Sequence, residues 1–288
     1  MTFRSRLSRL TLVSPDDQPA FTDALWRQLR LEAEQAYAHA PSLAPLFLDS
    51  ILNQPNFESA LFHRIAARLK SDVISQSVIL QAFHRAAEAT PDIGLGLKAD
   101  LTAVFDRDPA CERLIEPFLY FKGFHAIQVH RLTHWLWNEG ERDFALYLQS
   151  RSSEVFQTDI HPAARIGRGI LLDHATGLVV GETAVIEDDV SLLQGVTLGG
   201  TGKEAGDRHP KIRRGVMIGA GAKILGNIEI GEDARIAAGS VVLISVPPGT
   251  TVAGVPARVV RAASANAGSR SADEILREVS YTAFDYTI

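Results

Sequence analysis

Three histidines stand in polar segments of the C-terminal half of the chain, each within two positions of a charged residue. The pairs are His161 with Asp159, His174 with Asp173, and His209 with Arg208. A neutral imidazole can accept a proton near pH 7, because its unperturbed pKa is about 6.5, and a nearby carboxylate can orient the ring. The three pairs together are therefore candidates for a functional site, of which a general base is one kind. Three imidazoles gathered around one point would instead predict a zinc site with an open fourth position.

The elements that must hold these residues follow from an aliphatic residue that returns every six positions. The first run is Ile160, Ile166, Leu172, Leu178, Val190 and Val196, with Ala184 in the one smaller slot; the second is Ile212, Ile218, Ile224, Ile230, Ile236 and Val242. A strict period of six is typical of a hexapeptide β-helix, in which each short strand points one aliphatic side chain inward before the chain turns. Such coils stack into one continuous core.

The period also predicts which residues stack and where the coil is interrupted. With three strands in each coil, Ile160, Leu178 and Val196 should form one column. The interval from Val196 to Ile212 is 16 residues, which is one repeat plus ten. The extra stretch, about 200–211, is polar and rich in glycine, and it contains the third histidine pair. A loop extruded from a regular coil is a common location for functional residues.

The N-terminal half has a different pattern, because its apolar residues recur with helical spacing from about residue 20 to 155. Four or more helices fit there, and Ser42 and Asn56 are expected to cap two of them. We therefore predict an α+β chain. Its parts are an all-helical N-terminal domain that forms a subunit interface (1–157), a parallel β-helix (158–260) and a flexible tail (261–288).

Composition excludes several classes of function. The net charge of −5 over 288 residues gives no reason to expect nucleic acid or an anionic membrane surface as a partner. The single cysteine, Cys111, excludes an intrachain disulfide. The chain has no run of 18 apolar residues, so we expect no membrane span and a cytoplasmic location. Residues 1–13 share the Arg- and Ser-rich composition of organelle transit peptides, but a frayed N-terminus is the preferred interpretation.

Longer segments of the sequence resemble the serine acetyltransferase family. They are DRDPA (106–110), FKGFHA (121–126), DIHPAARIGRG (159–169), DHATG (173–177), GETAVI (181–186), GVTLGGTGK (195–203), DRHPKI (207–212), IGAGAKILGN (218–227) and AGVPA (253–257). Single hexapeptides are shared by many acyltransferases, whereas the combination of DHATG with DRHPKI is far more specific. The resemblance covers roughly residues 90–260 and implies that the β-helix is left-handed.

The resemblance implies that the chain makes O-acetyl-L-serine from L-serine and acetyl-CoA, in cysteine biosynthesis. His174 corresponds to the family's general base, and Asp159 to the carboxylate that orients its ring. A serine hydroxyl is a poor nucleophile until a base takes its proton. Acetyl transfer is therefore expected to be direct, without an acyl-enzyme.

The resemblance also implies which residues bind the zwitterionic substrate. Asp108 and Asp173 correspond to the family's substrate-binding acids, and either suits the ammonium group. Arg208 and His209 correspond to its substrate-binding loop, and Arg208 suits the carboxylate through a forked, charge-assisted contact. The same four residues are expected to bind L-cysteine as a feedback inhibitor.

Acetyl-CoA is implied as a co-substrate, with no permanently bound cofactor and no metal. The positions that correspond to the family's acetyl-CoA groove are Gly200, Thr201, Ala220 and Ala238. The family forms trimers, often paired into hexamers, with active sites between adjacent subunits. Its C-terminal isoleucine, Ile288 here, is implied to bind O-acetylserine sulfhydrylase.

Three other functions stay open at this point. A hexapeptide acetyltransferase that acts on a sugar or antibiotic hydroxyl would share the coils and one catalytic histidine. A β-helix carbonic anhydrase would bind zinc through His161, His174 and His209, although an arginine beside a ligand is unfavourable for a cation. A non-catalytic scaffold would give no reason for acids and histidines at these positions.

Overall fold

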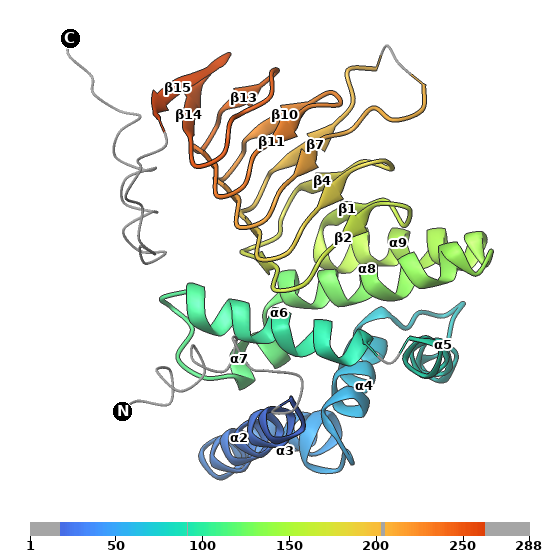
Figure 1. Cartoon of the computed structure of the whole chain (residues 1–288). Coiled ribbons are helices and arrows are strands. Elements are labelled where there is room, and N and C mark those ends of the chain that lie inside the picture. The colour runs from blue at the N-terminus through green and yellow to red at the C-terminus, as the bar shows by residue number, and fades with distance from the viewer. Residues whose placement is uncertain (1–17, 91, 203–204, 263–288) are drawn as a thin grey trace.

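The computed structural model describes residues 18–90, 92–202 and 205–262. Helices occupy the N-terminal part of the described chain, and a stack of short strands follows them (Figure 1). The helices are α2 (Gln18–His39), η2 (Pro41–Leu43), α3 (Ala44–Phe47), η3 (Leu48–Leu52), α4 (Phe57–Leu69), α5 (Gln76–Ala89), α6 (Ile93–Arg107), α7 (Ile115–Leu119), α8 (Lys122–Asn138) and α9 (Arg142–Phe156).

The strands form three sheets that run along the sides of a β-helix. The first sheet contains β1 (Thr158–Ile160), β4 (Leu178–Val180), β7 (Thr197–Gly199), β10 (Lys223–Leu225) and β13 (Val241–Val242). The second contains β2 (Arg165–Ile166), β5 (Val185–Ile186), β8 (Lys211–Ile212) and β11 (Glu229–Ile230). The third contains β3 (Leu171–Leu172), β6 (Ser191–Leu192), β9 (Met217–Ile218), β12 (Arg235–Ile236), β14 (Thr251–Gly254) and β15 (Ala257–Arg261).

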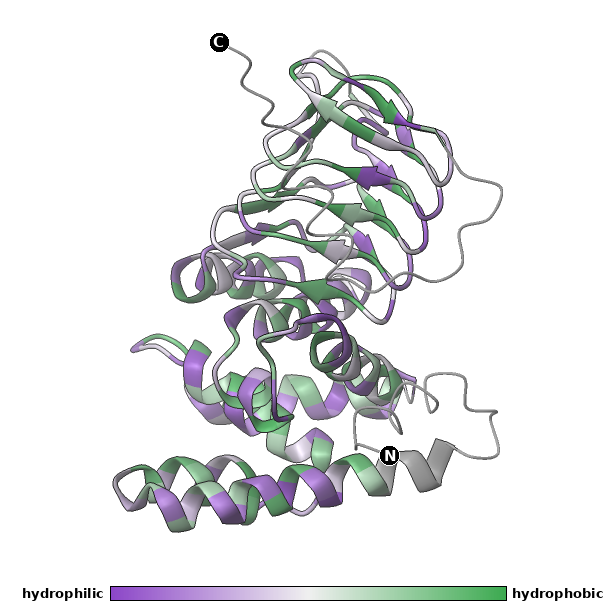
Figure 2. Cartoon of the chain, turned by 90° about the vertical axis from the view of Figure 1, so that its left-hand side faces the viewer, coloured by the Kyte–Doolittle hydropathy of each residue, from purple (hydrophilic) through white to green (hydrophobic). Residues whose placement is uncertain are grey.

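Neighbouring strands within each sheet are parallel, except for the antiparallel pair β14 and β15. Inward-facing aliphatic residues make a continuous core, and hydrophobic segments recur from coil to coil in Figure 2. The prediction of a helical part followed by a parallel β-helix is confirmed. No helix in the described part of the chain is long and apolar enough to cross a membrane.

The register between coils shows that the predicted columns were wrong. Ile160 pairs with Val180, twenty positions later, and Leu178 lies opposite Thr158. The reason is the corner at 173–177, which has two residues more than the regular spacing allows. Both Leu178 and Val180 are buried, so the core accepts the change of phase.

The extruded loop is also shorter than predicted. Ile186 pairs with Ile212, 26 positions later, where a regular coil would need 18. The loop therefore adds eight residues instead of ten. Both departures from the period, at 173–177 and in the loop, contain residues with the chemistry proposed from the sequence.

Helix starts agree with the sequence in one of two cases. Asn56 caps α4, because its Oδ1 accepts a hydrogen bond from Ser59 N at 2.8 Å. Ser42 is not an N-cap and lies inside the short helix η2. The expectations for residues 1–13, for the tail beyond 262 and for Ile288 fall outside the described residues.

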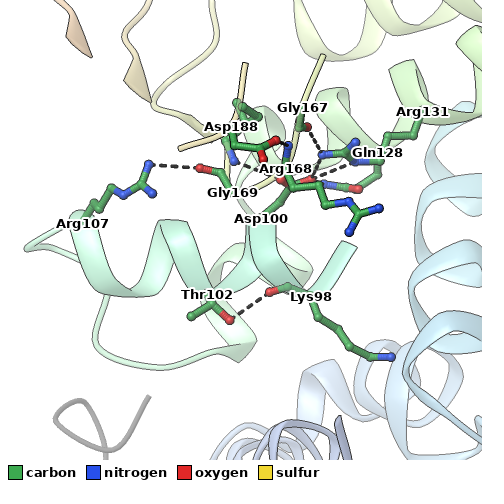
Figure 3. A network of polar contacts seen from close by, with 11 residues as sticks. Lys98, Asp100, Thr102, Arg107, Gln128, Arg131, Gly167, Arg168, Gly169 and Asp188 are labelled. Carbon is green, nitrogen blue, oxygen red and sulfur yellow. Dashed lines mark hydrogen bonds and ion pairs between the residues drawn. The ribbon is translucent and has the colours of Figure 1, made fainter. Parts of the chain in front are cut away.

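A buried polar network joins α6 and α8 to the first coil (Figure 3). Asp100 is fully buried, and its carboxylate accepts hydrogen bonds from Gln128 Nε2 at 2.9 Å, Arg131 Nε at 2.9 Å and Nη2 at 2.6 Å, and Ile170 N at 3.0 Å. Arg131 Nη2 also donates to Gly167 O at 2.7 Å. A buried ion pair is stable only when its remaining donors and acceptors are satisfied in this way. The network fixes α6 against the β-helix.

The C-terminal end of α6 has its own anchor. Arg107 Nη1 donates to Gly169 O and Asp189 O, both at 3.0 Å, and its Nη2 contacts Asp189 Oδ1 at 3.0 Å. Two successive coils are thereby tied to one guanidinium. Asp108, the next residue, is held at the edge of the first coil.

Candidate active site

His174 lies on the corner between β3 and β4, where the backbone is left-handed at two successive residues. The φ angles are 55° at His174 and 61° at Ala175. Non-glycine residues in this region cost about 1 kcal/mol or more each. The side chain of His174 is 73% exposed, and its Nε2 lies 3.6 Å from Asp173 Oδ2. The corner thus presents an imidazole outward beside a carboxylate.

A cavity of about 400 Å³ brings three of the predicted residues together. Asp108 from the end of α6 lines it, together with Asp173 and His174 from the corner. Lys122 and Gly123, at the start of α8, also line it. The cavity joins two carboxylates and an imidazole, a set that suits a small substrate with an ammonium group next to a hydroxyl.

The electrostatics of this cavity agree with that chemistry. Burial raises the pKa of Asp173, the adjacent His174 opposes the shift, and the negative charge of Asp108 raises that pKa further. Two carboxylates in one cavity repel each other when both are ionised. A bound cation would relieve this repulsion, so the pair favours an ammonium ligand.

Arg208 and His209 lie elsewhere, on the extruded loop at a different corner of the coils. Arg208 Nη2 forms an ion pair with Glu182 Oε2 at 2.8 Å, and this hydrogen bond is the main cause that lowers the pKa of Glu182. Thr183 Oγ1 accepts hydrogen bonds from the backbone N–H groups of Arg208 and His209, at 3.0 and 3.2 Å. The end of the loop is therefore tied to the corner at 181–184.

The ring of His209 is buried against the chain at Gly181. A Cβ added at Gly181 would lie 2.1 Å from His209 Cδ2 and Nε2, so only glycine leaves room for the ring. Nδ1 accepts from Thr183 N at 3.1 Å, which leaves the proton of the neutral ring on Nε2. Burial, followed by the charge of Arg208, lowers the pKa of His209. The side chain is thus a neutral hydrogen-bond donor at pH 7.

His161, the remaining histidine of the β-helix, packs edge-on against Trp137 with ring centroids 5.1 Å apart. Its Nδ1 accepts from Ala163 N at 3.1 Å, and burial lowers its pKa. Among the described residues, no group of three His, Cys, Asp or Glu side chains is placed to hold a metal ion.

Asp159 does not contact His174 in the described chain. It is exposed on β1, and its Oδ1 accepts a hydrogen bond from Gln149 Nε2 at 2.6 Å. A backbone hydrogen bond joins the His174 corner to the residue that precedes β1, from Gly177 N to Gln157 O at 2.8 Å.

The residues proposed for acetyl-CoA divide between the same two corners. Ala220 and Ala238 stand on the corner above His174, where successive turns are linked by Gly195 N to Thr176 O and by Gly239 N to Ala220 O, both at 2.8 Å. Gly200 lies at the loop corner, where its Cβ position is 3.4 Å from Arg208 Cγ. Thr201 follows Gly200 on this loop.

Four residues that hold these sites were not identified from the sequence. Lys122, Glu182 and Thr183 stand within the segments that carried the family resemblance, which was the available signal. Gln149 had no signal, since it is one polar residue on a helix face ten positions before Asp159.

Comparisons with known proteins agree with this arrangement. Residues 25–129 match the family model for the N-terminal region of serine acetyltransferase, and residues 209–243 match the bacterial transferase hexapeptide model. The serine acetyltransferase of Salmonella typhimurium strain LT2 is 52% identical over 264 residues, which are 92% of this chain and 96% of that protein.

Solved structures give the same result. The crystal structure of serine acetyltransferase from Brucella abortus strain S19, in complex with coenzyme A, has a TM-score of 0.84 and 59% identity, and the match covers 87% of this chain and 99% of that one. A serine acetyltransferase in complex with cysteine has a TM-score of 0.81 and 53% identity, covering 83% and 99% of the two chains. With such identity over nearly the full length of its relatives, this chain belongs to the serine acetyltransferase family.

Proposed function

We propose that this protein transfers the acetyl group of acetyl-CoA directly to the hydroxyl of L-serine, which gives O-acetyl-L-serine and CoA. The observation that carries the proposal is the cavity that Asp108, Asp173 and His174 line together. In this proposal the serine ammonium binds between the two carboxylates. The hydroxyl then lies within reach of the imidazole.

His174 is the general base of the proposed reaction. Its imidazole takes the hydroxyl proton as the serine oxygen attacks the thioester carbonyl, and the imidazolium then protonates the departing CoA thiolate. Asp159 orients the ring and stabilises the imidazolium, after a change from its present hydrogen bond with Gln149.

Each active site is proposed to form between two copies of the chain. Within one chain the cavity lining includes neither Arg208 nor His209. The residues for serine and those for acetyl-CoA are divided between the same two corners of the β-helix. Contact between one corner of a subunit and the other corner of its neighbour would complete both groups together, as in a cyclic trimer. Arg208 would then bind the serine carboxylate, and His209 would donate from Nε2.

A subunit-mixing experiment tests the shared site. His174→Ala and Arg208→Ala variants are inactive separately in this proposal. If they are co-expressed as mixed oligomers, about one quarter of the sites are intact with random assembly, because each site takes one corner from each neighbour. Mixed oligomers with no more activity than the separate variants would show that each chain forms its own site.

L-cysteine is proposed to compete with serine for the same cavity. It has the same ammonium and carboxylate groups, so Asp108, Asp173, Arg208 and His209 would bind both ligands. We expect inhibition that is competitive against L-serine. An Asp108→Asn variant should raise the cysteine inhibition constant and the serine KM together, whereas a change in only one would place the inhibitor elsewhere.

The larger assembly and the tail belong to the proposal too. The helical part (1–157) pairs two β-helix trimers (158–260) into a hexamer, and exposed apolar residues near the N-terminal helices, Leu31, Tyr37 and Leu43, support an interface there. Light scattering, which measures the molar mass of the assembly in solution, should give the mass of six chains. The tail (261–288) would bind O-acetylserine sulfhydrylase through Ile288, and calorimetry with a chain that lacks Ile288 should show no binding.

The central experiment is an acceptor comparison. CoA release is measured with L-serine and with sugar or antibiotic hydroxyls, for the wild type and for His174→Ala. We expect turnover with L-serine and a loss of at least 100-fold in kcat for the variant, since a positioned base contributes about 10²–10⁴-fold. Turnover with a sugar but not with serine would establish the alternative hexapeptide acetyltransferase function.

A further inference from the structure

The corner that presents His174 is tied to neighbouring coils at its two ends, by Asp173 N to Leu192 O at 2.9 Å and by Gly177 N to Gln157 O at 2.8 Å. Its internal hydrogen bonds are short-range, from Ala175 N to Asp173 O at 2.6 Å and from Thr176 N to His174 O at 2.7 Å. Two left-handed residues in succession are unfavourable and persist only where the surroundings determine them. Since the His174 side chain is mostly exposed, its direction depends on the backbone beneath it.

Lys122, from the helical part, forms hydrogen bonds with this corner. Its Nζ donates to Thr176 Oγ1 and also to Gln157 Oε1, the latter at 3.3 Å. An ammonium has donors only, so the Thr176 hydroxyl must accept from it. The hydroxyl can then donate its own proton onward, and Thr176 Oγ1 donates to His174 O at a distance of 3.4 Å. A directed chain of hydrogen bonds therefore runs from Lys122 to the backbone of His174.

The base of Lys122 is itself fixed. Gly123, the next residue, lies so close to β3 that an added Cβ would be 1.9 Å from Leu172 O. The start of α8 therefore packs in direct backbone contact with β3, the strand that leads into the corner. A lysine at the first position of a helix is opposed by the helix dipole, so the hydrogen bonds of Lys122 are formed against a small electrostatic cost.

We propose that Lys122 is a positioning residue, which clamps the left-handed corner through Thr176 and so sets the direction of the His174 imidazole. The proposal rests on the proposed function in its choice of His174 as the base. It adds a residue of the helical part that acts on the base through the backbone of the corner.

The test uses the full-length oligomer with Lys122→Met, which retains the stem and removes the ammonium. We expect kcat to fall about 10- to 100-fold, because small misplacements of a catalytic group have effects of this size. The KM for acetyl-CoA and the melting temperature should stay near the wild-type values. Lys122→Arg should recover part of kcat, since it restores donors at this position. Arg85→Met is the control, because it removes an exposed ion pair with Glu141 on the helical part.

Two further measurements separate the clamp from other roles. Amide exchange by mass spectrometry should be faster in peptides that cover 173–178 in Lys122→Met, a readout that does not depend on the reaction. The double variant with Thr176→Val should lose no more kcat than the more damaging single variant, because both act through one chain of hydrogen bonds.

Each other outcome overturns the clamp. Unchanged kcat or unchanged exchange in Lys122→Met, or fully additive losses in the double variant, would do so. A raised serine KM with an unchanged kcat would instead make Lys122 a substrate contact. A wild-type protein that fails to acetylate serine refutes the proposed function. If the wild type is active and Lys122→Met has the same kcat, only this inference is refuted.

Discussion

A single methyl group at Gly123, in the wall of the cavity, is predicted to disable the active site. The Cβ of Gly123→Ala would lie 1.9 Å from Leu172 O and 2.9 Å from Leu172 C. Carbon and oxygen atoms that are not bonded to each other rarely approach closer than about 3.3 Å. The start of α8 and the end of β3 must therefore separate by roughly 1.4 Å. Because the obstructing atoms belong to the backbone, no rotamer change can relieve the contact.

This separation would displace the backbone that leads into the catalytic corner. Leu172 precedes the corner at 173–177, and Gly123 follows Lys122. A displacement of about 1 Å in a catalytic group costs about 100-fold in rate, so we expect kcat/KM for serine to fall by about that factor. Overpacking should also lower the free energy of unfolding by about 1–3 kcal/mol. Helix propensity alone predicts the opposite sign, since alanine is favoured over glycine by about 1 kcal/mol.

The assay is steady-state CoA release together with urea unfolding, and Gly94→Ala on α6 is the matched control. A Cβ at Gly94 would approach Glu58 Oε1 at 2.8 Å, but this atom is the end of a flexible side chain that can move. We expect the control to remain within about twofold of the wild type in kcat/KM. If Gly123→Ala behaves like the control in both measurements, the close approach between α8 and the corner does not determine the site.

Three further predictions follow from buried groups. Asp100→Ala should lower the free energy of unfolding by about 3–5 kcal/mol in urea titrations, because it leaves the guanidinium of its partner buried and unpaired; a loss below about 1 kcal/mol would contradict this. Burial lowers the pKa of His125 and His130 from 6.5 to about 3. Each ring binds a proton more readily in the unfolded chain, so the free energy of unfolding should fall as the pH falls below about 6.5, by about 2 kcal/mol per ring at pH 5. His125→Gln should remove the contribution of one ring to the pH dependence of the urea midpoint. Gly181→Ala should displace the ring of His209 and raise the serine KM about tenfold or more, with the KM for acetyl-CoA as the internal control, because the added Cβ would lie 2.1 Å from the ring.

The six-residue period was sufficient to predict a β-helix, since an inward aliphatic residue on each short strand is a local property of the sequence. The segments around Asp173 and Arg208 were sufficient to predict the family and the type of chemistry. The family is confirmed by the relatives, whereas the roles of the individual site residues remain proposals.

The phase of the coils could not be obtained from the period. Leu178 and Val180 are both buried, so either residue could continue the count, and only the pairing of Ile160 with Val180 shows that the corner has two extra residues. Corner length is set by backbone conformation at 173–177, including left-handed φ angles at residues that are not glycine, which the sequence does not signal.

The meeting of distant segments was decided by the tertiary structure alone. Asp108 reaches the His174 corner because the buried network at Asp100 and the anchor at Arg107 dock α6 on the first coil. Lys122 contacts this corner because Gly123, which has no Cβ, allows the start of α8 to pack directly against β3. These contacts join residues more than 30 positions apart, so no local sequence pattern indicates them. The sequence by itself determined the repeat and the reactive side chains, and the packing of helices on the first coil determined which of those side chains share a cavity.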